Sequence, residues 1–316
     1  MSVSSISNLI IRYKKSTIIT IMENNNMKSD PPLIYGINEQ VIKKHILEKF
    51  IPSCKDNETE VYLKKYCLET ESFVRSTMAS VLRKVMSRTD TNAYVGRGQM
   101  FVFSSEQLEQ LLIKAIGKDK MNTYLKNGKL LDIGAGDGTV TENYKKFVKH
   151  ITATEVSTYM VGRLKENSSI DEVVETGTLD TFDVNNKFNV ISCLNVLDRC
   201  DYPSKLLKDI RARLDIENGG LLIVALVLPW CPFVENGTKQ DVPSEDLNMD
   251  GGRCKSRNSF EEAVNTIIDN VFLPHGYNVK AWTRLPYICA GDTYQRYYVL
   301  TDAFFVLECC DPIVEN

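Results

Sequence analysis

The stretch "LLDIGAGDG", residues 130–138, joins a short apolar run to a glycine-rich turn. Gly134, Gly136 and Gly138 occupy every second position after the run. Glycine tolerates the backbone dihedrals of such a turn, and it has no side chain to keep a ligand away from the backbone. The stretch therefore predicts the first strand of an open α/β sheet, followed by a ligand-binding turn.

The spacing of the glycines indicates which ligand the turn binds. A dinucleotide-binding fingerprint has the form G-x-G-x-x-G, whereas here Thr139 stands at the sixth position and Asp132 lies two residues before the first glycine. This disfavours a nicotinamide cofactor. An acid before G-x-G-x-G resembles motif I of class I S-adenosylmethionine-dependent methyltransferases, in which it faces the cofactor's ammonium group directly or through water. Glu155 follows about 20 residues later, where a carboxylate can accept hydrogen bonds from both ribose hydroxyls.

Short apolar runs alternate with helix-like stretches after Lys129. The expected strands cover residues 130–133, 151–154, 188–193, 221–228, 279–284 and 297–308, and the expected helices cover 139–149, 157–166, 203–214 and 259–273. This alternation predicts a βαβ-type open sheet with helices on both faces and antiparallel pairing at its end.

The residues before this core have a different pattern. Residues 35–128 predict an N-terminal helical layer packed on a core of residues 129–310. Its expected helices run from an Asn38 cap to about residue 50, from about residue 60 to 85, and from a Ser104–Gln107 capping box to residue 116, with a break at 89–100. Residues 1–34 are polar and linker-like, and we expect a disordered or targeting tail.

Composition excludes several classes of protein. Hydrophobic residues make up 43% and charged residues 25% of the 316 residues, as in soluble globular proteins. The net charge of -3 and the lack of a Lys/Arg stripe argue against a nucleic-acid partner, and no apolar run reaches the ~20 residues of a membrane span. Nine cysteines without a C-x-x-C pair and only three scattered histidines predict neither a metal site nor a disulfide framework.

Asn195 and Asp198 follow the apolar run 188–193 and are candidates for the catalytic site. Ligands of open α/β sheets bind outside the carboxyl ends of the strands, near the point where strand order reverses. We therefore expect both side chains beside the transferable methyl group. A structural alternative makes Asp198 a helix cap or a partner of Arg199.

The chemistry of this pair narrows the methyl acceptor. "NVLD" lacks the prolines and the aromatic residue of the D/N-P-P-Y/F motif, which disfavours exocyclic amide or base nitrogens. A lysine must lose its proton, which a nearby carboxylate opposes, and a hydroxyl needs a stronger base than Asp. An imidazole with a pKa of ~6.5 is mostly neutral at pH 7, and Asp198 could orient it by accepting its ring hydrogen. The same argument fits a guanidino or guanine-like acceptor.

From about Phe101 to Leu307 the chain resembles the methyltransferase-like protein 9 (DREV) family of protein-histidine N-pros-methyltransferases. The shared stretches include "FVFSS", "LLDIGAGDG", "LNVLDRCD", "TRLPY" and "YYVL", of which the last three are more specific than the glycine turn. The resemblance implies the class I Rossmann-like fold with a seven-stranded, mostly parallel sheet. It also implies S-adenosylmethionine as cofactor and methylation of the pros nitrogen, Nδ1, of histidine in His-x-His sequences.

The resemblance also implies roles for individual residues. By matching motif, Asn195 and Asp198 are catalytic, and Asp198 orients the substrate imidazole. Tyr287 and Tyr298 line the substrate pocket, with Tyr287 close to the cofactor. The residues expected to contact the cofactor are Asp132, Gly134, Gly136, Glu155, Asn195 and Tyr287.

Other functions remain open at this point. The same fold could methylate a small molecule or RNA, or serve as a cofactor-binding scaffold without turnover. The expected partners are proteins with His-x-His sequences, and we expect a monomer without metal, nucleic acid or membrane span. Family resemblance suggests the endoplasmic reticulum or the mitochondrion, and otherwise the cytoplasm.

Overall fold

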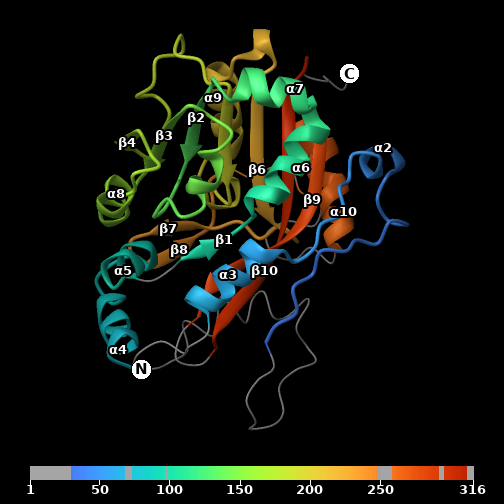
Figure 1. Cartoon of the computed structure of the whole chain (residues 1–316). Coiled ribbons are helices and arrows are strands. Elements are labelled where there is room, and N and C mark those ends of the chain that lie inside the picture. The colour runs from blue at the N-terminus through green and yellow to red at the C-terminus, as the bar shows by residue number, and fades with distance from the viewer. Residues whose placement is uncertain are drawn as a thin grey trace.

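Eight strands form the central sheet of the computed structural model, which describes residues 30–67, 73–96, 99–245, 247, 249, 258–291 and 295–311 (Figure 1). The strand order is β1-β9-β10-β6-β5-β2-β3-β4. The strands are β1 (Met100–Phe101), β2 (Lys129–Ile133), β3 (His150–Glu155), β4 (Glu172–Glu175), β5 (Val190–Leu194), β6 (Leu221–Val227), β9 (Tyr277–Ala290) and β10 (Tyr297–Cys309). The predicted α/β fold is confirmed.

The sheet has a parallel part and an antiparallel part. β6, β5, β2, β3 and β4 are parallel neighbours, whereas β10, β9 and β1 pair antiparallel. The expected number of seven strands is wrong, because β1 adds an eighth strand by pairing Met100 and Phe101 with the edge of β9. Two strands, β1 and β4, have only two and four residues, too few for a clear apolar pattern.

Strand order reverses beside β2. The chain passes from β2 to β3 and β4 on one side, and then returns to β5 on the other side. β2 and β5 pair directly, with Asp132 opposite Ser192 and Ile133 opposite Cys193. The turns that follow these two strands therefore leave the same edge of the sheet side by side, which is where open α/β sheets bind ligands.

The hairpin of β9 and β10 is longer than the parallel strands. β10 pairs with β6 over Asp302 to Glu308, but with β9 over its whole length from Tyr297 to Cys309. Asp302 lies opposite Val227, the last residue of β6. Residues 297–301 of β10 and their partners on β9 consequently extend beyond the carboxyl end of the parallel strands.

Helices cover both faces of the sheet (Figure 1). Leu207 of α9 (Pro203–Arg213) and Val264 of α10 (Phe260–Ile267) belong to one buried cluster, together with Ile46 of α2 (Lys44–Leu47). Leu108 and Leu111 of α6 (Ser105–Ile116) belong to the cluster on the other face, and the short α7 (Lys118–Lys120) follows α6. No helix in the described part of the chain is long and apolar enough to cross a membrane.

Most predicted helices are present at nearly their expected positions. The expected helices at 157–166, 203–214 and 259–273 are α8 (Thr158–Lys165), α9 and α10, which continues into a π-helical turn. Ser104 and Gln107 form both bonds of the predicted capping box at α6. The expected helix from about residue 60 begins as α3 (Asn57–Tyr66), which Asp56 caps, and α4 (Phe73–Leu82) follows.

Two predicted helices are wrong. Residues 139–149 contain only a 3₁₀ turn at Thr141–Tyr144, because the Thr141 hydroxyl donates to buried Asp132 and the Lys149 N–H donates to Gly128 O. Residues 38–50 contain only the four-residue α2. There the chain turns toward β9 instead, where Trp282 N–H donates to Lys49 O.

One helix lies where the sequence predicts a break. α5 (Arg88–Tyr94) begins after Ser87, whose hydroxyl accepts from Asp90 N–H, and the helix packs on α8. A small hairpin of β7 (Val234–Asn236) and β8 (Lys239–Asp241) follows β6. Cys231 before this hairpin is disulfide-bonded, although the cysteine spacing predicts no disulfide framework.

Candidate active site

The glycine turn after β2 has the backbone geometry that its sequence predicts. Gly134, Gly136 and Gly138 have φ angles of 69°, 60° and 81°, in the left-handed region that favours glycine. A Cβ atom on Gly134 would lie 2.8 Å from Val196 Cγ2, so the turn touches the loop that follows β5. A Cβ atom on Gly136 would meet nothing within 4 Å. The turn therefore packs on one side and leaves open space at Gly136.

Glu155, at the end of β3, is bound to this turn. Its Oε2 accepts from Gly136 N–H at 3.0 Å, and its Oε1 accepts from the N–H groups of Val156 and Ser157 at 2.9 and 3.0 Å. A carboxylate has about four acceptor positions, of which these bonds use three. One position remains for a ribose hydroxyl while these bonds persist, whereas the sequence suggested a contact to both.

Asp132 on β2 links the two central strands. Its carboxyl group is buried and accepts from the hydroxyls of Ser192 on β5 and Thr141 after the glycine turn. Burial raises the pKa of Asp132 to about 6, although both hydrogen bonds lower it. The two hydroxyl partners were not predicted. They hold the acid beside the turn, in the place where its sequence motif puts it.

Asn195 leaves β5 in an unusual conformation. Its φ of 55° is the only positive φ among the described residues other than glycine, and asparagine tolerates this region better than most residues. Its N–H donates to Ala225 O on β6, and its Nδ2 donates to Asp302 Oδ2 on β10 at 2.9 Å. Its Oδ1 is buried and has no hydrogen-bond partner among the described residues. This amide oxygen is available to a bound ligand.

Asp198 lies in the 3₁₀ turn Leu197–Arg199, one turn after Asn195. It is 1% exposed, its Oδ1 has no hydrogen-bond partner in the described structure, and its Oδ2 lies 3.7 Å from Arg199 Nε. Burial raises the pKa of Asp198, and the Arg199 guanidinium opposes this shift. Asp198 does not cap α9, whose N-cap residue is Tyr202. The alternative pairing with Arg199 is present but satisfies only one carboxylate oxygen.

Aromatic rings surround the Arg199 guanidinium. Its Cζ atom lies 5.6 Å from the ring centroid of Phe233 and 6.0 Å from that of Tyr287. Tyr287 is buried on β9, and its hydroxyl donates to Met100 Sδ on β1. Burial raises the Tyr287 pKa, so the hydroxyl keeps its proton at neutral pH.

Tyr298 shares a face of the β9–β10 hairpin with Tyr287. Tyr298 lies opposite Cys289, and Tyr287 lies opposite Leu300, so both tyrosines point to the same side of the hairpin. Tyr298 is four residues from Asp302 along β10, a separation of ~13 Å at the usual strand rise. The structure thus brings Asn195, Asp198 and Tyr287 together and places Tyr298 farther out on the hairpin.

Asp302 is a site residue that the sequence analysis missed. It is fully buried on β10, its Oδ2 accepts from Asn195, and its Oδ1 has no hydrogen-bond partner among the described residues. Burial raises its pKa to about 7; the bond from Asn195 lowers it, and the nearby Asp198 raises it further. An acid inside the apolar run "TDAFFVLE" was the available signal, because acids are rarely fully buried without a reason.

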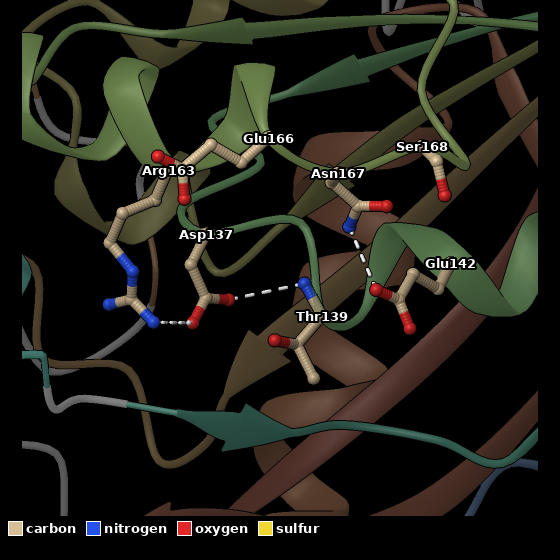
Figure 2. Close-up of a pocket in the computed structure, with 7 residues that line it drawn as sticks. All are labelled: Asp137, Thr139, Glu142, Arg163, Glu166, Asn167 and Ser168. Atoms are coloured by element: carbon tan, nitrogen blue, oxygen red, sulfur yellow. Dashed lines mark hydrogen bonds and ion pairs between the residues drawn. The ribbon is translucent and has the colours of Figure 1, made fainter.

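An open polar pocket of about 320 Å³ adjoins the glycine turn on its other side (Figure 2). Figure 2 shows Arg163 and Asp137 pointing toward each other, and Asn167 pointing toward Glu142. Arg163 Nη2 lies 3.0 Å from Asp137 Oδ2, and Asn167 Nδ2 donates to Glu142 Oε1 at 2.9 Å. None of the predicted site residues lines this pocket. Its lining residues are Asp137, Thr139, Glu142, Arg163, Glu166, Asn167 and Ser168. No group of three or more His, Cys, Asp or Glu residues in the described chain could hold a metal ion.

The residues around the turn fit S-adenosylmethionine. The open space at Gly136 admits a ligand against the backbone, and Glu155 retains one acceptor position for a ribose hydroxyl. The buried Oδ1 of Asn195 requires a hydrogen-bond donor, which the cofactor can supply. These features come from the ends of β2, β3 and β5, as the motif predicts.

Comparison with known proteins gives a family and several more distant relatives. The profile of the DREV methyltransferase family matches residues 34–309. The mitochondrial ubiquinone biosynthesis O-methyltransferase of Saccharomyces cerevisiae is 29% identical over 101 residues, which are 30% of this chain and 32% of that protein. The corresponding Schizosaccharomyces pombe protein is 26% identical over 30% of this chain and 36% of its own length. The chain thus spans about a third of the length of the curated relatives it matches.

Solved structures of low identity were also matched. PKMT2 from Rickettsia typhi in complex with AdoHcy is 24% identical over 33% of this chain and 22% of that chain, with a TM-score of 0.29. The precorrin-6y C5,15-methyltransferase of Geobacter metallireducens is 14% identical over 64% of this chain and 88% of its own, with a TM-score of 0.35. Because the family profile covers residues 34–309, the chain belongs to the DREV methyltransferase family, with the class I methyltransferase fold and S-adenosylmethionine as its cofactor.

Proposed function

We propose that this protein transfers a methyl group from S-adenosylmethionine to the pros nitrogen, Nδ1, of histidine in His-x-His sequences of other proteins. The observation that carries this proposal is the buried Asp198 carboxylate oxygen without a hydrogen-bond partner in the described structure. It lies in the loop whose Val196 touches the glycine turn. A buried polar atom of this kind calls for a donor, and the ring N–H of a neutral imidazole is one.

The cofactor supplies an electrophilic methyl group when it is bound. The glycine turn offers open space at Gly136, and the Glu155 carboxylate fixes that turn through the Gly136 N–H. Asn195 presents its Oδ1 from the end of β5, beside Asp198. The role of these residues would be to bind and orient the cofactor, because methyl transfer to an available lone pair depends mainly on the alignment of the methyl group with the acceptor nitrogen.

Asp198 would act on the acceptor in two ways. By accepting the hydrogen of the ring nitrogen Nε2, its carboxylate fixes the tautomer in which Nδ1 carries the lone pair. As the N–C bond forms, the ring becomes positively charged, and the carboxylate stabilises that charge in a water-poor site. The Nε2 proton then leaves the ring by way of the carboxylate, which restores a neutral methylimidazole.

Arg199 can stay in place when the acceptor enters, because it faces Asp198 Oδ2 whereas the imidazole would donate to Oδ1. Its guanidinium is 3.7 Å from Asp198 Oδ2 and contacts the rings of Phe233 and Tyr287. The carboxylate would then hold the guanidinium cation near one oxygen and, on the other oxygen, a ring that becomes cationic during the reaction. The carboxylate therefore keeps a partner throughout, and the same aromatic rings could pack against the imidazole.

The test uses the whole protein, labelled S-adenosylmethionine and a peptide with repeated His-x-His sequences. A matched peptide with these histidines replaced by asparagine serves as the acceptor control. We expect label only in the first peptide, and hydrolysis should release the pros isomer of methylhistidine. The tele isomer, or labelling of the asparagine peptide, would contradict the proposal. Labelling only of RNA or of a small phenol would support the alternative acceptors.

An isosteric variant tests the role of Asp198. Asp198→Asn keeps the size of the side chain but removes the charge, and it should lower the rate of methyl transfer by about 10²–10³-fold. Its affinity for S-adenosylhomocysteine should change little. Asp209→Asn on α9, whose carboxylate pairs with Lys205, is the matched control. Full activity in Asp198→Asn would refute the assignment, and cofactor binding without any transfer in the wild type would indicate a scaffold.

A further inference from the structure

Asn195 is held in place by hydrogen bonds to two strands, one from the parallel part of the sheet and one from the antiparallel part. Its N–H is bound to β6, a parallel strand, and its side chain is bound through Asp302 to β10, an antiparallel strand. A positive φ at a residue other than glycine costs roughly 1–2 kcal/mol, so such a residue needs outside support. The Asn195 Nδ2 to Asp302 Oδ2 bond is one of these supports.

The bond to Asp302 also decides which end of the Asn195 amide is available. An asparagine side chain has a donor end and an acceptor end, which a 180° rotation exchanges. Asp302 accepts from the donor end, so Oδ1 is the end that remains without a partner in the described structure. A carboxyl group at position 302 therefore orients the amide with its acceptor available.

The charges near Asp302 explain how a second buried acid can be present there. Asp198 and Arg199 reach it from the turn after β5, and Tyr287 and Cys289 face it from β9. Arg199 Nε lies 3.7 Å from Asp198 Oδ2, whereas Asp302 accepts its hydrogen bond from the neutral amide of Asn195. Of the two acids, Asp198 is therefore the better placed to carry the negative charge, and Asp302 is the better placed to keep a proton.

We propose that Asp302 is a positioning residue of the cofactor site, which acts by holding the Asn195 amide with Oδ1 toward a donor group of S-adenosylmethionine. This inference rests on the proposed cofactor contact of Asn195, but not on histidine as the acceptor. In its protonated form Asp302 still accepts from Asn195 through its carbonyl oxygen. An amide at position 302 can do the same.

A double-mutant cycle on cofactor affinity tests this proposal. The variants are Asn195→Ala, Asp302→Ala and the double variant, and calorimetry measures binding of S-adenosylhomocysteine. Each single variant should weaken binding about tenfold, the effect of one lost hydrogen bond of ordinary strength. Because Asp302 acts through Asn195, the double variant should be no more than about twofold weaker than either single variant. Independent losses that multiply to about a hundredfold would overturn the proposal.

Two further variants separate positioning from general damage to the sheet. Asp302→Asn should restore affinity to within about twofold of wild type, because its amide oxygen still accepts from Asn195 Nδ2. Thr283→Val is the matched control, since Thr283 is buried on neighbouring β9 and its hydroxyl has no hydrogen-bond partner in the described structure. It should bind normally. If Asp302→Asn binds as weakly as Asp302→Ala, or Thr283→Val weakens binding as much, Asp302 does not act by orienting the amide.

The readout is independent of the methyl acceptor. Coupled loss of S-adenosylhomocysteine affinity in these variants supports the role of Asp302 even if no histidine peptide is methylated. Conversely, histidine methylation without coupling between Asp302 and Asn195 supports the proposed function and refutes the role of Asp302. Should wild type itself bind no S-adenosylhomocysteine, both would fail together with the cofactor assignment.

Discussion

Three carboxyl groups are buried in the sheet and its loops: Asp132 on β2, Asp198 in the turn after β5, and Asp302 on β10. Burial raises the pKa of each, which means that the fold holds them at a cost in stability when they are ionised. Asp132 has two hydroxyl partners, whereas Asp198 and Asp302 each keep one oxygen without a hydrogen bond in the described structure. Of these three acids, Asp198 and Asp302 are therefore the two that can still accept a hydrogen bond from a ligand or a neighbouring group.

The pH dependence of stability should report the burial of Asp302. Its pKa is about 7 in the folded chain against an ordinary value of 3.8, so the folded state binds the proton more tightly. The contribution of this group to stability falls as pH rises from about 4 to about 7, and is constant above that range. Asp302→Asn removes the ionisation, so its stability advantage over wild type should be about 2 kcal/mol larger at pH 8 than at pH 5.

Urea unfolding of both proteins at the two pH values measures this difference. Asp209→Asn provides the comparison for the loss of an acid on α9, whose carboxylate pairs with Lys205. An advantage of Asp302→Asn that is the same at pH 5 and pH 8 would show that Asp302 does not titrate between these values.

Among the elements, the glycine turn contains two positions, Gly136 and Gly138, at which the same substitution should affect cofactor binding and stability differently. Gly136→Ala adds a methyl group to open space beside the turn, so it should weaken S-adenosylhomocysteine binding more than about tenfold. Its positive φ should cost roughly 1–2 kcal/mol of stability. Gly138→Ala pays the same conformational penalty, but its methyl would lie 2.8 Å from Ile170 Cδ1 and Leu164 Cδ1.

Gly138→Ala should therefore destabilise the fold by about 1–3 kcal/mol beyond that penalty, because its methyl overpacks a filled site. Thermal unfolding and calorimetric titration of both variants provide the two measurements. Equal losses of stability in the two variants would contradict the different surroundings of their Cβ positions.

Prediction from sequence worked where an element is decided by its own residues. The parallel strands β2, β3, β5 and β6 lie at the predicted short apolar runs, and α6 has a capping box in its own first turn. Prediction failed where a partner distant in the sequence decides the local structure. Residues 139–149 do not form the predicted helix because the Thr141 hydroxyl donates to Asp132. Residues 48–51 are not helical because their backbone pairs with that of Trp282. Neither partner is visible in the local pattern.

The same distinction applies to the candidate site. Gly134, Glu155, Asn195 and Asp198 could be named because a motif or a strand end identifies each. Asp302 could not, because its contact with Asn195 spans 107 residues of sequence and depends on β10 lying beside β6. Strand order at an antiparallel edge is not contained in the hydrophobic pattern.

Across the whole molecule, the segment before α3 is joined to the far edge of the sheet by Trp282. The Trp282 indole N–H donates to Ile46 O at 2.8 Å, and its ring lies 4.8 Å from that of Phe50. Its backbone N–H and C=O bond to Lys49 and Ile51. Residues 46–51 therefore fold as part of the sheet's own packing.

Trp282→Phe should lower the free energy of unfolding by about 2–4 kcal/mol, because it leaves a cavity and loses the indole hydrogen bond to the Ile46 carbonyl. Unfolding should stay a single transition. Trp230→Phe is a well-matched control, because Trp230 is also buried but its indole N–H has no hydrogen-bond partner in the described structure. Urea unfolding measures both variants, and an equal loss in Trp230→Phe would argue against a special role of the Ile46 bond.

The β9–β10 hairpin extends past the last residue of β6, and this overhang has an evolutionary consequence. It carries Tyr287 and Tyr298, whereas the glycine turn and Glu155 belong to parallel strands on the far side of β6. Exchanges or insertions in residues 285–290 and 297–301 would reshape the proposed wall of the acceptor site without disturbing the glycine turn. Relatives with this architecture can therefore differ in their methyl acceptors while keeping the same methyl donor.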